Sequence, residues 1–197
     1  MNCKFCVRYQ GDGVRCASCD PIPYTGILVD FQIKELIKMG VIEADESKVQ
    51  PSSIDLHLGE LFFLEMPEKS GVVKSDGYHV KWFDSMANAI ALEPGQPCLA
   101  SVQEKVTLPN WLTMELRLTS TEGRDCIQHA LAVWGDPGFS GRMTLELQNV
   151  SQHHTLILTE GDRICQAVFH AHMPCEKGYK GRYQGDDGTS PAKGIAS

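Results

Sequence analysis

Short stretches of alternating apolar and polar residues, each closed by glycine, proline or asparagine, run through most of the chain and constrain its fold most strongly. Such alternation is typical of strands with one buried face. Examples are "SIDLHLG", "ELFFLEM", "GYHVKWF", "PCLASVQEKVTL", "LTMELRLTS", "HALAVWG", "RMTLELQNV", "HTLILTEG" and "RICQAVFHAH". One segment, "VDFQIKELIKMG", predicts a helix, with Asp30 as its N-cap and Gly40 as its end. Many short strands with almost no helix predict an all-β fold, either a barrel or a sandwich.

The composition is that of a globular protein with one full core and a small appendage. The chain has 197 residues, of which 42% are hydrophobic and 22% are charged. Its apolar runs are too short to cross a bilayer and it begins without a secretory signal, so we expect a cytoplasmic protein with no membrane contact. The net charge of −7 argues against broad nucleic-acid binding, because phosphate contacts need clustered lysine and arginine. A few well-placed donors would still hold a small anion.

Two Cys-x-x-Cys pairs lie near the N-terminus. Each pair can turn two thiolates onto one metal ion, and two pairs complete a tetrahedral Zn²⁺ site. The predicted ligands are Cys3, Cys6, Cys16 and Cys19. A reduced or adventitiously oxidised tail is the alternative interpretation. The other four cysteines, Cys98, Cys126, Cys165 and Cys175, are predicted to be buried thiols.

The sequence divides into three parts. Residues 1–22 form the small zinc-ribbon-like segment, residues 26–176 form the main β domain, and residues 177–197 form a glycine-rich polar arm that we expect to be flexible. The zinc segment either contacts nucleic acid through its few cations or serves as a structural or protein-contacting knuckle. Those cations are Lys4, Arg8 and Arg15. Three cations are few for nucleic acid, so both interpretations stay open.

Five segments of the main domain and arm, in order, resemble the dCTP deaminase family, which shares the fold of the trimeric dUTPases. They are "QPSSIDLHLGE", "LEPGQPCLASVQEKVTLP", "DPGFSGRMTLELQNVS", "LTEGDRICQAVFH" and "GRYQGDDG". The third is similar to the family's Asp-Pro-Gly-Phe-x-Gly-x-Leu-Thr-Leu-Glu-Leu-x-Asn along its whole length. The matches run from Ile27 to Gly188. The resemblance therefore implies a distorted β-barrel or jelly roll of the dUTPase-like type, with one N-terminal helix.

The resemblance assigns the central chemistry to Glu146. The family's general acid/base is the glutamate of Thr-Leu-Glu-Leu, which the dUTPases lack and which is Glu146 here. It would take a proton from the water that attacks C4 of cytosine, then protonate N3 and the departing amine. From the strand pattern alone, Glu146 could equally face solvent. The H-x-E…P-C-x-x-C signature of zinc-dependent deaminases is absent, so the predicted zinc is structural.

A second part of the implied site is the loop "TSTEGR", which resembles the family's Arg-Ser-Ser-x-x-Arg. The resemblance gives Ser120 and Arg124 the task of organising water and base, with the hydroxyl of Thr121 beside them. It also implies that Arg124 reaches the site from a neighbouring subunit. The following "QHALA" places His129 and Ala132 next to the base, where main-chain groups can read the pyrimidine edge.

The remaining implied nucleotide contacts come from a turn, a strand and the arm. They are Asp136, Gln166, Tyr179, Arg182, Tyr183 and Gln184, of which the last four close over the nucleotide. Three positions depart from the family pattern: Thr119 replaces an arginine, Glu122 replaces a small or apolar residue, and Asp186 replaces a glutamine. These changes make a triphosphate pocket less cationic or poorer in donors. A modified or monophosphorylated nucleotide, or a loss of activity, therefore stays open.

The resemblance also implies a homotrimer with active sites at subunit interfaces. The implied reaction converts a deoxycytidine nucleotide, dCTP, into dUTP and ammonia, with Mg²⁺ on the triphosphate. Two alternatives stay open. One is a bifunctional enzyme that also cleaves the triphosphate to give dUMP, and the other is a nucleotide-binding regulator whose zinc segment contacts a protein or nucleic acid.

Overall fold

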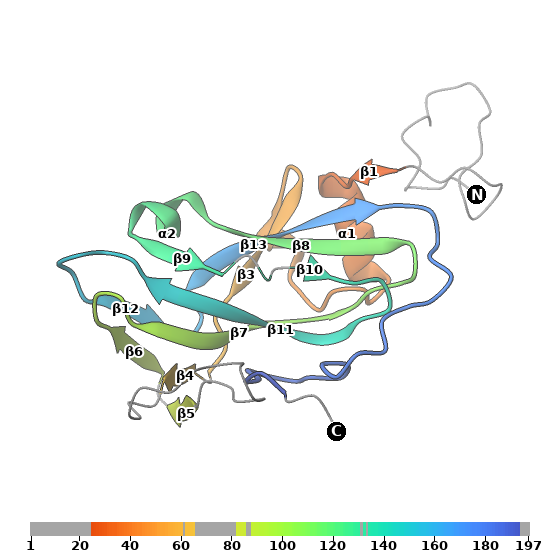
Figure 1. Cartoon of the computed structure of the whole chain (residues 1–197). Coiled ribbons are helices and arrows are strands. Elements are labelled where there is room, and N and C mark those ends of the chain that lie inside the picture. Colours follow the sequence, from red (N-terminus) through yellow and green to blue (C-terminus); the bar gives the residue numbers. More distant parts are fainter. Residues whose placement is uncertain are drawn as a thin grey trace, which may run out of the picture.

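Strands are the main secondary structure of the molecule, and most of them form two facing sheets (Figure 1). The computed structural model describes residues 25–60, 62–65, 82–85, 88–130, 132 and 134–193. The prediction of an all-β fold is confirmed. Within these ranges, no helix is long and apolar enough to cross a membrane.

The first sheet joins segments from both ends of the main domain. Its strand order is β10-β8-β13-β3-β2, and β1 pairs with β13 outside that path. Its members are β1 (Gly26–Ile27), β2 (Val49–Gln50), β3 (Ser53–His57), β8 (Leu112–Leu118), β10 (Trp134–Gly135) and β13 (Arg163–Ala171). Every pairing in it is antiparallel, as expected where no helix crosses over between neighbouring strands.

The second sheet carries the candidate site. Its strand order is β5-β4-β7-β11-β9. Its members are β4 (Phe62–Glu65), β5 (Trp82–Ser85), β7 (Pro97–Thr107), β9 (Ile127–His129) and β11 (Ser140–Asn149). Two further strands, β6 (Ala89–Leu92) and β12 (Leu156–Thr159), form a separate two-stranded sheet.

The hydrophobic core lies between the two large sheets. In Figure 1, β8 and β13 lie in one layer and β7 and β11 in the other. From β11 the core receives Met143, Leu145 and Leu147, and from the facing layer it receives Met114 and Phe169. Burying each such side chain contributes about 1.5–3 kcal/mol. A one-residue slip of β11 would expose its three apolar side chains, so the core fixes the register of this strand.

The predicted helix is present as α1 (Asp30–Lys38), but its N-cap is Val29 and not Asp30. The Val29 N–H donates a hydrogen bond to Gln32 Oε1 at 3.1 Å. The Gln32 side chain thus satisfies one of the donors left free where the helix begins. The Asp30 carboxylate lies within the first turn and accepts a hydrogen bond from the Phe31 N–H at 2.7 Å.

Two single turns were not predicted. Helix α2 (Ser120–Arg124) follows β8, and the 3₁₀ turn η1 (Glu46–Lys48) precedes β2. A single turn has no apolar periodicity for the sequence to reveal. At the start of α2, the Thr119 side chain accepts a hydrogen bond from the Glu122 N–H at 3.4 Å and acts as the N-cap.

The cysteines divide into three groups. The four N-terminal cysteines lie outside the described residues, so the zinc segment stays a prediction. Cys98 and Cys165 are buried, which confirms the prediction for them. The same prediction is wrong for Cys126 and Cys175, which are half-buried. Both lie in connections outside the strands, and the Cys175 thiol donates to the Lys177 carbonyl at 3.3 Å.

The described part of the predicted arm, residues 177–193, packs beside the first half of β11. The Tyr179 N–H donates to the Pro137 carbonyl at 2.7 Å. At this crossing a β-carbon on Gly138, whose φ is +88°, would lie 2.8 Å from the α-carbon of Gly178. Two backbones meet here, so glycine is required. The flexibility of the arm stays a prediction.

Replacing Cys126 with glycine should stabilise the fold. Cys126 has a φ of 66°, in the left-handed region that costs a non-glycine residue about 1 kcal/mol or more. We expect Cys126→Gly to raise the free energy of unfolding by about 0.5–1 kcal/mol, because the greater backbone freedom of glycine offsets part of the gain. Urea denaturation measures the change. Cys126→Ala keeps the β-carbon and should bring no gain; an equal gain in both variants would assign the effect to the thiol.

Candidate active site

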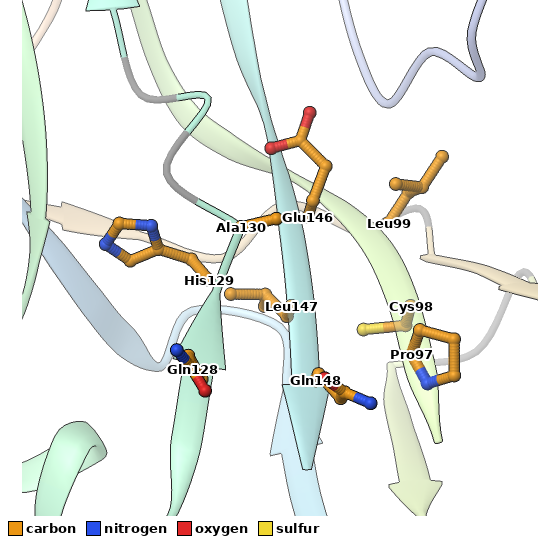
Figure 2. A pocket seen from close by; sticks show the side chains of 9 residues that line it. All are labelled: Pro97, Cys98, Leu99, Gln128, His129, Ala130, Glu146, Leu147 and Gln148. Carbon is orange, nitrogen blue, oxygen red and sulfur yellow. The ribbon is translucent and has the colours of Figure 1, made fainter. Parts of the chain in front are cut away.

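The register of three strands places Glu146 in the wall of a pocket. In β11, Glu146 lies opposite Leu99 of β7, and its carbonyl accepts a hydrogen bond from the Ala130 N–H at 3.0 Å. Gln148 pairs with Gln128 two residues further along. Because side chains alternate across a strand, all five lie on one face of the sheet. The pocket has a volume of about 380 Å³ and is lined by Pro97, Cys98, Leu99, Gln128, His129, Ala130, Glu146, Leu147 and Gln148 (Figure 2).

Glu146 is half-buried, and one of its carboxyl oxygens has no hydrogen-bond partner. Its Oε2 is the only buried carboxylate oxygen without a hydrogen-bond partner in the part of the chain that the structure describes. Burial raises the pKa of Glu146 to about 7, since removal from water disfavours the charged form. A carboxyl group that is half protonated near neutral pH can both accept and deliver a proton.

Two buried acids, Glu104 and Asp55, differ from Glu146 in having hydrogen-bond or ion-pair partners. Glu104 is 3% exposed and contacts Lys48 Nζ at 3.0 Å and His57 Nδ1 at 2.9 Å. Asp55 accepts a hydrogen bond from Gln166 Nε2 at 3.1 Å. Both acids have partners, as structural buried carboxylates do. Gln166 therefore lies on the first sheet, bound to Asp55, and not among the residues that line the Glu146 pocket.

His129 lines the pocket from the other face of the sheet. Its cross-strand partner is Leu147, which points into the core. The imidazole Nδ1 is buried and has no hydrogen-bond partner among the described residues. Burial, and then the nearby positive charge of Arg117, lowers the pKa of His129 and favours the neutral ring. This placement makes His129 part of the pocket wall.

Several pocket residues were missed by sequence reasoning. Ala130, and not Ala132, lies beside Glu146, and Ala132 is exposed and does not line this pocket. Gln128 and Gln148 were also missed. The strand alternation showed which β11 side chains share a face, but the neighbours of those side chains depend on pairing with strands far away in the sequence.

The loop residues of the predicted site lie elsewhere on the same chain. Ser120, Thr121 and Arg124 are exposed on α2, and none of them lines the Glu146 pocket. Arg124 borders a second pocket of about 370 Å³ together with Glu122. Burial raises the pKa of Glu122. One chain alone therefore does not bring α2 to Glu146.

The predicted contacts from the arm and the turn gather at the Ser140 end of β11. Those from the arm are Tyr179, Arg182, Tyr183 and Gln184. Gln184 fastens the arm: its Oε1 accepts from the Ser140 N–H at 3.2 Å, and its Nε2 donates to the Gly138 carbonyl at 3.0 Å. Asp136 is exposed in the turn before the strand, and its carbonyl accepts from the Phe139 N–H at 3.0 Å.

The raised pKa of Glu146 makes stability depend on pH. Its folded-state pKa of about 7 exceeds the ordinary 4.5, so the protonated group favours folding below about pH 4.5, and this contribution is lost as the pH rises through 7. We expect Glu146→Gln to be more stable than the wild type by about 1–2 kcal/mol at pH 8, and equal to it near pH 4.5; partial exposure to water keeps the gain below full linkage. Thermal unfolding of both proteins at each pH measures this. A pH-independent difference would contradict it.

Comparison with known proteins places these features in a family. The model of the family described as dCTP deaminase-like matches residues 27–172. The "dCTP deaminase, dUMP-forming" of Coprothermobacter proteolyticus is 35% identical over 178 residues, covering 82% of this chain and 92% of the relative. The protein of the same name from Persephonella marina is 36% identical over 176 residues, covering 85% and 96%.

A solved structure supports the fold. The crystal structure of 2′-deoxycytidine 5′-triphosphate deaminase from Agrobacterium tumefaciens matches with a TM-score of 0.58 and 24% identity. The match covers 75% of this chain and 48% of that one, so this chain spans about half of the solved chain. The family match over most of the sequence, together with the two relatives, shows that the chain belongs to the dCTP deaminase-like family.

Proposed function

We propose that this protein is a hydrolase that deaminates a deoxycytidine nucleotide, converting dCTP and water into dUTP and ammonia. The observation that carries the proposal is Glu146, a half-buried carboxyl with one unpartnered oxygen and a pKa of about 7 in the wall of a pocket. The relatives named dCTP deaminase, dUMP-forming support the same substrate class.

The chemistry needs one group that moves protons in both directions. Water adds to C4 of cytosine while Glu146 takes one of its protons. The carboxyl gives this proton to N3, then takes the proton of the new C4 hydroxyl and delivers it to the departing amine, and the C4–N4 bond breaks to release ammonia. A pKa close to the working pH suits a group that must act as base and acid in one cycle. Its position on a paired central strand holds the carboxyl rigidly.

Mg²⁺ would accompany the triphosphate. Among the described residues, no three histidine, cysteine, aspartate or glutamate side chains gather in a way that could hold a metal ion. The phosphates would therefore supply most of the ligands, as is usual for magnesium bound with a nucleotide. A Zn²⁺ ion at the N-terminal cysteines would be structural.

The site would be completed by a neighbouring subunit of a homotrimer. Ser120, Thr121 and Arg124 are exposed on α2 and do not line the pocket of their own chain. We propose that Arg124 and Ser120 reach the Glu146 of the next subunit, where they position the water and the base. Exposed polar side chains gathered on one short helix suit this use.

The proposed reaction is tested by ammonia release from dCTP, with Glu146→Gln as the matched variant. The amide keeps the shape of the side chain but cannot shuttle a proton. We expect the variant to lose activity by about 100-fold or more. Nucleotide binding without ammonia release by the wild type would contradict the deaminase and favour a regulatory protein of the same fold.

The shared site is tested by mixing two inactive variants. Glu146→Gln and Arg124→Ala should each be inactive alone. In mixed trimers some interfaces pair an intact Glu146 with an intact Arg124, so an equal mixture that exchanges subunits should recover about a quarter of wild-type activity. Absence of recovery, with exchange shown by mass spectrometry, would contradict a site built from two subunits.

A second candidate is a bifunctional enzyme that also cleaves the triphosphate and releases dUMP. The names of the relatives favour it, since they are described as dUMP-forming. Product analysis with dCTP separates the candidates: dUMP and pyrophosphate indicate the bifunctional enzyme, and dUTP indicates deamination alone. Addition of dUTP as substrate shows whether the second step proceeds independently.

A further inference from the structure

Two carboxylates of the arm form ion pairs, one with Arg142 of β11 and one with a lysine within the arm. Asp187 Oδ1 contacts Arg142 Nε at 2.9 Å. Asp186 pairs with Lys193 Nζ, and that ammonium group also lies 5.3 Å from the centre of the Tyr183 ring. The hydrogen bond from Arg142 lowers the pKa of Asp187, so its carboxylate is charged at neutral pH. The Asp187 contact fastens the arm to β11.

Arg142, the β11 member of the first ion pair, lies on the same face of the strand as Glu146. Arg142, Thr144 and Glu146 alternate with buried neighbours, so their side chains leave the strand on one side. The Ser190 N–H of the arm donates to Thr144 Oγ1 at 3.1 Å, between the ion pairs and Glu146. Arg142 lies four positions before Glu146, which corresponds to about 13 Å along the strand. A nucleotide with its base over Glu146 and its phosphates directed along β11 towards Ser140 would bring the distal phosphates of a triphosphate to this end.

In that orientation the distal phosphates would meet Asp186 and Asp187 beside the two cations. Arginine and lysine are the usual phosphate ligands, and Arg142 and Lys193 are already paired with acids. A triphosphate must displace Asp186 and Asp187 to reach them. A monophosphate keeps its single phosphate close to the sugar and leaves both pairs intact.

We infer that Asp186 and Asp187 take the place of distal phosphates in closing the arm, and that the protein therefore deaminates deoxycytidine monophosphate as well as dCTP. In this reaction dCMP and water give dUMP and ammonia: a C4–O bond forms, the C4–N4 bond breaks, and Glu146 carries the proton to the amine. The inference rests on the proposed deamination at Glu146. It adds that the arm does not need the second and third phosphates.

The test compares kcat/KM for ammonia release from dCMP and from dCTP. For the wild type we expect the two values to agree within about tenfold. In the double variant Asp186→Asn, Asp187→Asn, the arm loses its own anions. The value for dCMP should then fall by about tenfold or more, while that for dCTP stays level or rises. Glu160→Gln, which removes an exposed charge away from the arm, is the matched control and should change neither value.

A kcat/KM for dCMP more than 100-fold below that for dCTP in the wild type would overturn the inference and leave the proposed deamination standing. An unchanged ratio in the double variant would also overturn it. No ammonia from either nucleotide would instead sink the proposed function.

Hydrogen exchange of the arm gives a second readout that does not depend on activity. The Ser190 and Gly185 N–H groups are bonded to β11 and should be protected without ligand. In the double variant, or in either single variant, this protection should be lost and then restored by dCTP but not by dCMP. Protection that survives removal of both acids would contradict their role.

Discussion

The partial burial of one carboxyl group, with an oxygen that has no hydrogen-bond partner, is the feature on which the site depends. Glu146 occupies the middle of a central strand, and the pairing of β11 with β7 and β9 decides which side chains surround it. A slip of one residue would turn Glu146 into the core and expose Leu145 and Leu147. The apolar face of the strand thus holds the acid in place, and the stability of the core and the geometry of the site have the same origin.

In the described part of the chain, the loss of stability caused by an acid without a full set of partners is confined to Glu146. Asp55 and Glu104 show that the same fold can give a buried acid its partners, from neighbouring strands and from a lysine and a histidine. The Oε2 atom of Glu146 has no such partner, and burial raises the pKa of Glu146 to about 7. Glu146 lowers the stability of the fold when it is charged, whereas Asp55 and Glu104 are paired. Such a difference is expected where function requires a group that selection for stability alone would not retain.

The parts of the structure that the sequence predicts are those with a local signal. The alternation of apolar and polar residues predicts strand β11, and Glu146 lies within a sequence motif that is contained in this one strand. Ala130 and Leu99 were missed because their position beside Glu146 comes from pairing between strands distant in the sequence. The placement of Gln166 on the first sheet, away from Glu146, likewise depends on how distant strands pair. The helix α2 was missed because one turn leaves no periodic pattern.

In the proposed reaction, Glu146 of the free protein is a base with a pKa of about 7. The most direct measurement is the pH dependence of kcat/KM for ammonia release from dCTP, because this ratio reports the essential groups of the free enzyme. We expect kcat/KM to rise with pH and to level off above a midpoint of about 7. A midpoint at the ordinary value of 4.5 would contradict it, because it would mean that the carboxyl is solvated and the pocket does not tune it.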